Sequence, residues 1–221
     1  MVFKAALFDL DGTLLDTLDD IADAANHILR RHGFPTHPTE AYRFFIGDGA
    51  GMLIRRSLPQ DLLDESLIQE CLDEWNEIYA VQWKMKTRPY PQIPAALDEL
   101  AKRGVRLAIL SNKPDSFTRQ MAAELLPSWN FDHVMGSSPE RPRKPNPQPA
   151  LMISAEMGIP PAEFLYLGDS GVDMKTARAA GMFAVGALWG LRPADELLAN
   201  GAQALLKSPL ELLAYFPLRE R

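Results

Sequence analysis

The sequence is poor in cysteine, has more acidic than basic side chains, and contains no apolar run long enough to cross a membrane. Cys71 is the only cysteine, so no disulfide can form within the chain, and a reducing cytoplasm is the simplest expected location. The opening stretch has only a brief apolar run, broken by Asp9 and Asp11, and we expect neither a signal peptide nor a membrane anchor. The net charge of −6 argues against a nucleic-acid partner, which would require a basic patch.

Metal-binding histidine patterns, internal repeats and low-complexity tails are also missing from the sequence. We interpret the four histidines as surface or core residues, because they lack ligand-like spacing: His27, His32, His37 and His133. Hydrophobic residues make up 47% of the 221 residues, which is enough for a core without disulfides or a structural metal. We expect one domain with an insertion, or two small domains.

Short apolar stretches that end at glycine, serine or aspartate recur along the chain and are typical of buried strands. We predict strands at residues 2–8, 106–110, 131–135, 164–167 and 182–188, with a last edge strand at residues 202–206. Amphipathic stretches between them predict helices at residues 93–103, 116–126, 147–157 and 173–180. Apolar strands that alternate with helices indicate an α/β fold, in which helices cover both faces of a parallel sheet.

Residues 16–88 interrupt this alternation, because they contain helical patterns and no convincing strand. One predicted helix starts near Leu18 and ends at Gly33, a second starts near Thr39, and a longer one covers residues 67–83. We therefore predict a catalytic core made of residues 1–15 and 89–221, and a small α-helical cap domain made of residues 16–88.

The most specific chemical signal is Asp9-Leu10-Asp11-Gly12-Thr13, which follows the first predicted strand directly. In an open parallel sheet, active sites form beyond the carboxyl ends of the strands, where both carboxylates would lie. Their spacing of two residues brings them to the same side of the extended chain. The alternative interpretation is a simple turn, with Asp11-Gly12 reversing the chain.

Three more polar features follow later strands in chain order, namely Ser111-Asn112, Lys144, and Asp169 with Asp173. Each has an ordinary explanation on its own, because Ser111 and Asp169 could cap helices and Lys144 could be a solvated loop residue. Arg141, Arg143 and Lys113 are nearby alternatives to Lys144. The order of all four features is difficult to attribute to chance.

In this order, the residues resemble the four motifs of the haloacid dehalogenase superfamily. The matching positions are Asp9-x-Asp11-Gly12-Thr13, Ser111, Lys144 and Gly168-Asp169-x-x-x-Asp173. The resemblance covers nearly the whole chain, including a helical insertion between the first two motifs. It implies a Rossmann-like parallel core, a cap domain, Mg²⁺ as the cofactor, and phosphoryl transfer through an aspartyl-phosphate.

The resemblance also assigns roles to individual residues. It implies three catalytic residues, Asp9, Asp11 and Lys144. It implies four metal-site carboxylates, Asp9, Asp11, Asp169 and Asp173. Phosphate and substrate contacts are expected from Thr13, Ser111 and Asn112 in the core, and from Gly47, Gly49 and Arg55 in the cap.

Elementary chemistry agrees with these roles. Asp9 would attack phosphorus, and Asp11 would protonate the leaving oxygen and then activate the water that hydrolyses the intermediate. Mg²⁺ prefers one or two carboxylates together with phosphate oxygens and water. Lys144 would offset the negative cluster, since a charge pair at ~5 Å and an effective dielectric of ~20 is worth about 3 kcal/mol before desolvation.

The choice within the superfamily depends on Asp11 and on the cap. By analogy, carbon–halogen hydrolases lack an acid at the position of Asp11, because a halide leaves without a proton. The segment 44–50 and the following arginine-containing helix resemble the phosphoglycolate phosphatase branch. Glycines at positions 47 and 49 allow a close backbone approach to a small substrate, and Arg55 or Arg56 could bind a carboxylate.

We therefore predict a phosphatase whose partner is a small phosphorylated metabolite, with 2-phosphoglycolate as the best single substrate. Pyrophosphate, nucleotides and other phosphomonoesters remain alternatives, as does a sugar-phosphate mutase with the same two aspartates. A receiver-type phospho-acceptor fits the motif spacing and the insertion poorly. The sequence does not decide between a monomer and a homodimer. Trp75, Tyr79 and Trp83 recur at helical spacing, which indicates a packed face.

Overall fold

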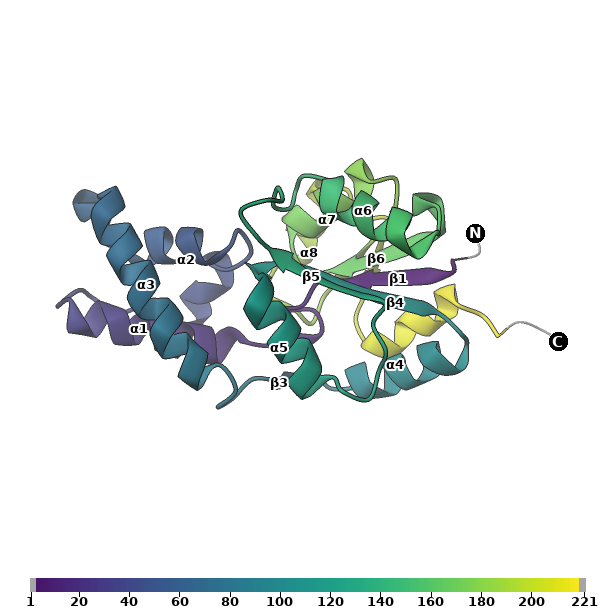
Figure 1. Cartoon of the computed structure of the whole chain (residues 1–221), viewed down its shortest axis with the longest axis horizontal. Coiled ribbons are helices and arrows are strands. Elements are labelled where there is room, and N and C mark those ends of the chain that lie inside the picture. Colours follow the sequence, from purple (N-terminus) through teal and green to yellow (C-terminus); the bar gives the residue numbers. More distant parts are fainter. Residues whose placement is uncertain (1–2, 219–221) are drawn as a thin grey trace.

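The computed structural model describes residues 3–218, and Figure 1 shows an α/β part beside a separate block of helices. The strands are β1 (Ala5–Phe8), β2 (Leu15–Asp16), β3 (Arg88–Pro89), β4 (Arg106–Pro114), β5 (His133–Ser137), β6 (Phe164–Gly168), β7 (Phe183–Ala187) and β8 (Ala204–Leu206). The α-helices are α1 (Leu18–Arg31), α2 (Ala50–Ser57), α3 (Glu65–Gln82), α4 (Ile93–Lys102), α5 (Asp115–Leu125), α6 (Gln148–Met157), α7 (Gly171–Ala179) and α8 (Ala194–Ala199). The 3₁₀ segments are η1 (Thr39–Phe44), η2 (Gln60–Leu62), η3 (Pro161–Glu163) and η4 (Pro209–Tyr215).

Six strands form one parallel sheet in the order β5-β4-β1-β6-β7-β8, which confirms the predicted Rossmann-like α/β class. At the end of central strand β1, Phe8 pairs with Ile109 of β4 and with Leu167 of β6. The chain segments that follow β1, β4 and β6 therefore leave the sheet at one edge. This edge is where the candidate active site lies.

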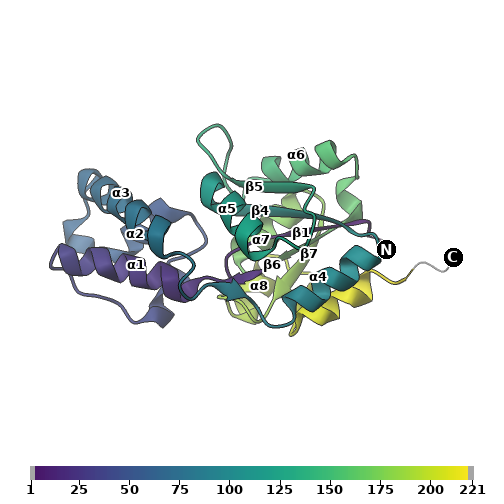
Figure 2. The same cartoon turned by 60° about the horizontal axis from the view of Figure 1, so that its bottom comes forward.

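Side chains alternate across the sheet because successive residues of a strand point to opposite faces. One face carries Phe8, Ile109 and Leu167, and it packs against α4, α5 and η4. The other face carries Leu7 and Leu110 with their neighbours, and it packs against α6, α7 and α8. Figure 2 shows these layers on both sides of the strands.

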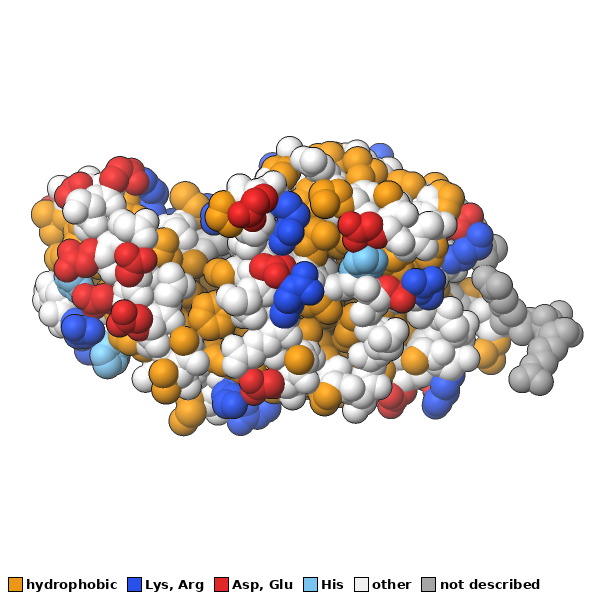
Figure 3. Space-filling model, in the orientation of Figure 1, with side chains coloured by type: hydrophobic (Ala, Val, Ile, Leu, Met, Phe, Trp, Pro, Cys, Tyr) orange, Lys and Arg blue, Asp and Glu red, His pale blue; other side chains and the backbone are white. Residues whose placement is uncertain are grey.

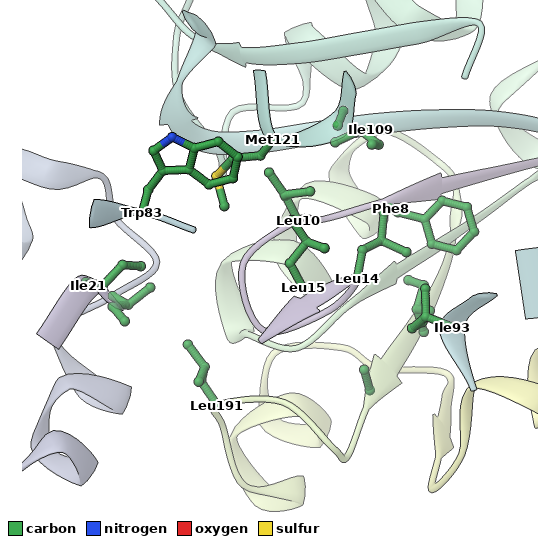
Figure 4. Close-up of a cluster of buried hydrophobic side chains, with 14 of the residues drawn as sticks. Phe8, Leu10, Leu14, Leu15, Ile21, Trp83, Ile93, Ile109, Met121 and Leu191 are labelled. Atoms are coloured by element: carbon green, nitrogen blue, oxygen red, sulfur yellow. The ribbon is translucent and has the colours of Figure 1, made fainter. Parts of the chain in front are cut away.

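The helical block contains α1, η1, α2 and α3, and Figures 1 and 2 place it beside the sheet rather than on a face of it. The helical block and the sheet part share one apolar cluster where they meet. Figure 4 shows Trp83 and Ile21 from the helical side together with Leu10, Leu15 and Met121. The division into a core of residues 1–15 and 89–221 and a cap of residues 16–88 stays a prediction.

The chain passes between these two parts twice, near residues 16 and 88. No strand was expected from residue 16 to residue 88, but the structure has a short one at each passage. Leu15 of β2 pairs with Pro89 of β3, so a two-residue antiparallel ribbon joins the helical block to the sheet. Such short strands leave no detectable period in a sequence. The carboxylate of buried Asp20 on α1 accepts hydrogen bonds from the backbone N–H groups of Lys86 and Thr87, which fixes the return crossing.

Element boundaries agree with the predictions to within a few residues. The largest difference is β4, which was expected to end at residue 110 but continues to Pro114 through a register shift against β5. The helix α8 was not predicted. The expected start of the first strand at residue 2 lies outside the described residues. None of the helices within residues 3–218 combines the length and the apolar character needed to span a membrane.

Candidate active site

A cavity of about 50 Å³ lies where the sheet edge faces the helical block. Polar groups on its core side come from the segments after β1, β6 and β7 and from the end of β4, and apolar groups come largely from the helical block. Its wall includes Asp9, Asp11, Ser111, Asn112, Lys113, Asp169, Arg192, Ile21, Ile46, Gly47, Gly49, Leu53 and Trp75.

The turn after β1 holds both motif aspartates at the cavity. The backbone N–H of Asp9 donates to the carbonyl of Leu167, 3.0 Å away, which continues the sheet pairing by one residue. Gly12 has φ +82°, and a β-carbon there would lie 2.2 Å from Oδ2 of Asp169. This position therefore requires glycine both for its backbone and for the close approach of Asp169.

Lys144 lies between two of the predicted metal-site carboxylates, and its own side chain is buried. Its Nζ is 2.8 Å from Oδ1 of Asp9 and 2.6 Å from Oδ1 of Asp173, and it also donates to the carbonyl of Leu110 at 3.1 Å. Burial opposes the charge of Lys144, but Asp173 and Asp9 raise its pKa well above the usual value. Among the candidates near position 144, the structure therefore brings Lys144 itself to Asp9.

Asp169 and Asp173 follow β6 and are both buried. Oδ1 of Asp169 accepts from the hydroxyl of Thr13 at 3.2 Å, and its Oδ2 accepts from the backbone N–H of Leu191 at 2.7 Å. Asp173 instead closes a capping box at the start of α7, where its Oδ2 accepts from the backbone and hydroxyl of Ser170. Asp173 thus has more protein partners than Asp169.

The three carboxylates of Asp9, Asp169 and Asp173 each offer an oxygen, and these oxygens lie within 4.8 Å of one another. Burial, followed by repulsion from Asp173, raises the pKa of Asp9 to about 7, although Lys144 is close. Burial and the charges of Asp9 and Asp173 likewise raise the pKa of Asp169 well above its usual range. For Asp9, burial and the repulsion from Asp173 outweigh the attraction of the Lys144 ammonium at 2.8 Å, so its pKa rises. A buried cluster of hard oxygen ligands with too little positive charge fits a divalent cation such as Mg²⁺.

Asn112 connects the two sides of the cavity. Its Nδ2 donates to the carbonyl of Gly47 in the helical block and to the carbonyl of Lys144, each at 3.0 Å. Its Oδ1 accepts from the backbone N–H of Lys144 at 2.9 Å. Ser111 also lies at the cavity, and Gly49 precedes α2 on the opposite wall. These predicted contact residues are therefore brought together.

Asp11 lies apart from the three-carboxylate cluster. Its two oxygens are 3.1 and 3.3 Å from Nζ of Lys113, a lysine whose side chain is only 3% exposed. Asp9 and Asp11 thus each face a different lysine. The expectation that Asp11 belongs to the metal site receives no support from this arrangement.

Arg55 is placed differently from the other predicted residues. It is not among the residues that line the cavity, and its guanidinium pairs with Glu65 at the start of α3. Arg56 instead donates to the carbonyl of Phe45 at 3.1 Å and pairs with Asp48, so it braces the glycine loop. The expected grip of Arg55 on a substrate carboxylate has no support from its position.

Several cavity residues were not identified from the sequence. Lys113 was noted only as an alternative to Lys144, and Trp75 was interpreted as a packing residue. Arg192 was not singled out, although its Nη2 donates to the carbonyl of Ile46 at 2.9 Å. No period or spacing marks Lys113 and Arg192, because Lys113 belongs to β4 and Arg192 follows β7.

One histidine lies beside acidic side chains. Oxygens of Glu70 and Glu74 lie within 4.8 Å of a ring nitrogen of His32, which stays interpreted as a surface residue. Arg31 pairs with Glu74 as well, and Glu70 is exposed. Figure 3 shows acidic side chains gathered over the helical block, where this group belongs.

Comparisons with known proteins agree with the geometry. The model of the family described as haloacid dehalogenase-like hydrolase matches residues 6–187. The phosphoglycolate phosphatase of Nitrosospira multiformis is 39% identical over 183 residues, covering 80% of each chain. That of Pseudomonas syringae pv. tomato is 34% identical over 191 residues, covering 85% of this chain and 70% of the other. A haloacid dehalogenase-like family protein of Streptococcus pneumoniae has a similar solved structure, with a TM-score of 0.87 at 28% identity, covering 97% of this chain and 99% of that one.

Proposed function

We propose that this chain, a phosphatase that belongs to the haloacid dehalogenase-like hydrolases, hydrolyses 2-phosphoglycolate through a phospho-aspartate on Asp9 in the presence of Mg²⁺. The observation that carries the proposal is the position of Asp9. Its carboxylate lies at the cavity, 2.8 Å from the Lys144 ammonium and within the cluster formed with Asp169 and Asp173.

The first half-reaction transfers the phosphoryl group to the protein. A carboxylate oxygen of Asp9 attacks phosphorus, and the bond from phosphorus to the ester oxygen breaks with its electron pair on that oxygen. The leaving oxygen takes the proton of Asp11, so glycolate departs as an alcohol. Lys144 stays beside Asp9 and offsets negative charge as the new bond forms.

The second half-reaction returns the protein to its starting state. Water attacks phosphorus while Asp11, now a carboxylate, takes its proton, and the bond between phosphorus and the Asp9 oxygen breaks. Inorganic phosphate leaves, and Asp11 carries a proton again. Ser111 and backbone N–H groups at the cavity would hold the phosphoryl oxygens.

Asp9 and Asp169, together with Asp173, would hold Mg²⁺, which when bound screens the phosphate dianion from the attacking carboxylate. Asp173 already accepts hydrogen bonds from Ser170 and Lys144. We infer that Asp173 mainly orients the other ligands, whereas Asp169 binds the ion.

Two observations support 2-phosphoglycolate over larger esters. The cavity of about 50 Å³ is small, and two relatives with at least 34% identity are named phosphoglycolate phosphatase. Arg192 at the wall provides positive charge for a second anionic group. A cytoplasmic location and a monomeric or homodimeric state remain predictions.

The test is phosphate release from a panel containing 2-phosphoglycolate, pyrophosphate, nucleotides and sugar phosphates, with Mg²⁺ or with EDTA. We expect release from 2-phosphoglycolate to exceed the others, to require Mg²⁺ and to vanish in Asp9→Asn protein. A preference for another ester would reject the substrate and keep the mechanism. Interconversion of sugar phosphates without release of phosphate would indicate a mutase.

A further inference from the structure

A second buried lysine, Lys113, links the catalytic aspartate Asp11 to the helical block. Its Nζ donates to both oxygens of Asp11 and, at 2.9 Å, to the phenol oxygen of Tyr79. Asp11 and Lys113 belong to the segments after β1 and within β4, whereas Tyr79 belongs to α3 of the helical block. The contact therefore crosses from one part of the molecule to the other.

Tyr79 is held firmly on the side of the helical block. Its ring stacks on Trp75 with centroids 4.5 Å apart, and the edge of Phe117 from α5 meets it at 5.3 Å. Tyr79 is fully buried, and Nζ of Lys113 lies 4.5 Å from the centre of its ring as well as near its oxygen. The ring and hydroxyl together define where the ammonium group sits.

Lys113 has few other ways to satisfy its charge. Within residues 3–218, the acceptors recorded for its Nζ are Asp11 and Tyr79. Burial opposes its charge, but Asp11 and Tyr79 raise its pKa to about 12. Without the phenol oxygen, a buried ammonium would lose a fixed partner and gain freedom to leave Asp11.

We propose that Tyr79 is a positioning residue, which fixes the Lys113 ammonium against Asp11 so that the acid–base carboxylate is correctly oriented only when the helical block is seated on the core. This inference rests on the proposed function, in which Asp11 gives its proton to the leaving oxygen and later takes one from water. The helical block then contributes to the chemical step as well as to the walls of the cavity.

Leaving-group dependence distinguishes this role from a purely structural one. The alkoxide of 2-phosphoglycolate is a poor leaving group and needs the proton of Asp11. The 2,4-dinitrophenolate ion is a good leaving group and departs without one. Because kcat/KM reports the steps up to formation of the phospho-aspartate, a misplaced Asp11 lowers kcat/KM for the first ester and spares the second.

The experiment compares wild type, Tyr79→Phe, Lys113→Met and the double variant on 2-phosphoglycolate and 2,4-dinitrophenyl phosphate with Mg²⁺. For 2-phosphoglycolate, we expect kcat/KM to fall about tenfold in Tyr79→Phe and about a hundredfold in Lys113→Met. For the dinitrophenyl ester, we expect less than about a twofold change in Tyr79→Phe. Because Tyr79 acts through Lys113, Tyr79→Phe should add nothing in the Lys113→Met background.

Tyr42→Phe is the matched control. Tyr42 is also fully buried, and its hydroxyl donates to Oδ1 of Asn26 at 2.9 Å, away from the cavity wall. We expect this variant to leave kcat/KM for both esters unchanged.

Three results would overturn the proposal. An equal loss on both esters in Tyr79→Phe would indicate a structural defect, and no loss on either would remove Tyr79 from the mechanism. A rise in KM for 2-phosphoglycolate with unchanged kcat in Lys113→Met would make Lys113 a substrate-binding residue. If wild type acts on another alkyl phosphate, that ester takes the place of 2-phosphoglycolate. Wild-type protein inactive on every ester would reject the proposed function itself.

Discussion

Lys144 and Lys113 are both buried, and each contacts an aspartate of the same cavity, but their other partners come from different parts of the molecule. Lys144 contacts Asp9, Asp173 and the carbonyl of Leu110, all within the α/β core. Lys113 contacts Asp11 in the core and Tyr79 in the helical block. The position of the attacking carboxylate, Asp9, is therefore fixed by the core alone. The position of the acid–base carboxylate, Asp11, depends on how the core and the helical block meet.

This difference separates nucleophilic attack by Asp9 from proton transfer by Asp11. The segments after β1, β4 and β6 are fixed by a continuous parallel sheet, so Asp9 keeps its surroundings even if the helical block moves. The contacts of Lys113, Asn112 and Arg192 with the helical block exist only when that block is seated. Opening would admit substrate and water, and closing would complete the site for proton transfer.

Among substitutions in the α/β core, we expect Lys144→Met to lower the unfolding free energy most. Lys144→Met leaves Asp9 and Asp173 buried without their cation, and we expect metal-free protein to lose about 3–5 kcal/mol in unfolding free energy. Urea denaturation monitored by circular dichroism measures this change. Lys113→Met should cost less, because Lys113 has one carboxylate partner, Asp11, whereas Lys144 pairs with Asp9 and also with fully buried Asp173. Lys84→Met, at a surface ion pair with Glu124, is the control and should change little. A smaller loss for Lys144→Met than for Lys113→Met would contradict the comparison.

Mg²⁺ binding is expected to stabilise the protein by an amount that depends on pH. The pKa of Asp9 is raised to about 7 in the folded metal-free protein, whereas its ordinary value is 3.8. Between these two pH values, Asp9 therefore carries a proton in the folded state but not in the unfolded state. Stability of the metal-free protein should therefore fall as pH rises from about 4 to 7. Mg²⁺ displaces protons from this cluster, so it should raise Tm more at pH 8 than at pH 5.

At saturating Mg²⁺ and pH 8, we expect a stabilisation of about 3 kcal/mol, which corresponds to several degrees in Tm. Differential scanning fluorimetry measures it, and Asp169→Asn should remove most of the shift. An equal shift in wild type and Asp169→Asn would place the ion elsewhere.

Substitutions of two asparagines test the contact between the α/β core and the helical block. Each asparagine makes three hydrogen bonds. Asn112 joins Gly47 to Lys144 across the cavity, whereas Asn26 binds His37 and Tyr42 within the helical block. We expect Asn112→Ala to raise KM for 2-phosphoglycolate about tenfold and Asn26→Ala to leave KM nearly unchanged. Steady-state kinetics provides the measurement. Equal effects on KM would mean that the cap loop needs no tie to the core.

The smallest effect is expected at Arg55, which lies away from the cavity and pairs with Glu65. Arg55→Ala should change kcat/KM for 2-phosphoglycolate by less than about twofold, because an exposed ion pair contributes little. Arg56→Ala should raise KM several-fold, since Arg56 holds the carbonyl of Phe45 and the carboxylate of Asp48. A large loss in Arg55→Ala alone would restore Arg55 as a substrate ligand.

The sequence predicted the core more completely than the cap for a physical reason. Core residues such as Asp9, Ser111 and Asp169 directly follow apolar stretches of the sequence, and all parallel strands end at one edge, so chain order alone places them together. The β2–β3 ribbon and α8 are too short to produce a period. Their positions follow from tertiary packing rather than local pattern.

Cap residues depend on how one helix lies against another part of the molecule. Tyr79 was correctly predicted to pack with Trp75, but its hydroxyl contact with Lys113 leaves no trace in helical spacing. Gly47 and Gly49 were found because a glycine loop has a chemical reason to approach a ligand. Arg55 was predicted as a substrate contact, and adjacent helical residues such as Arg55 and Arg56 point in different directions, but helical spacing does not tell which direction faces the cavity.

The most direct test of the account is to trap the phospho-aspartate. Asp11→Asn protein is mixed with 2,4-dinitrophenyl phosphate and Mg²⁺, then acid-quenched and mapped by peptide mass spectrometry. We predict a stoichiometric release of dinitrophenolate and one phosphoryl group on Asp9, removable by hydroxylamine, because this ester leaves without an acid while hydrolysis lacks its base. Continued turnover with an unmodified Asp9 would show that water attacks the substrate directly, and the nucleophilic role of Asp9 would be rejected.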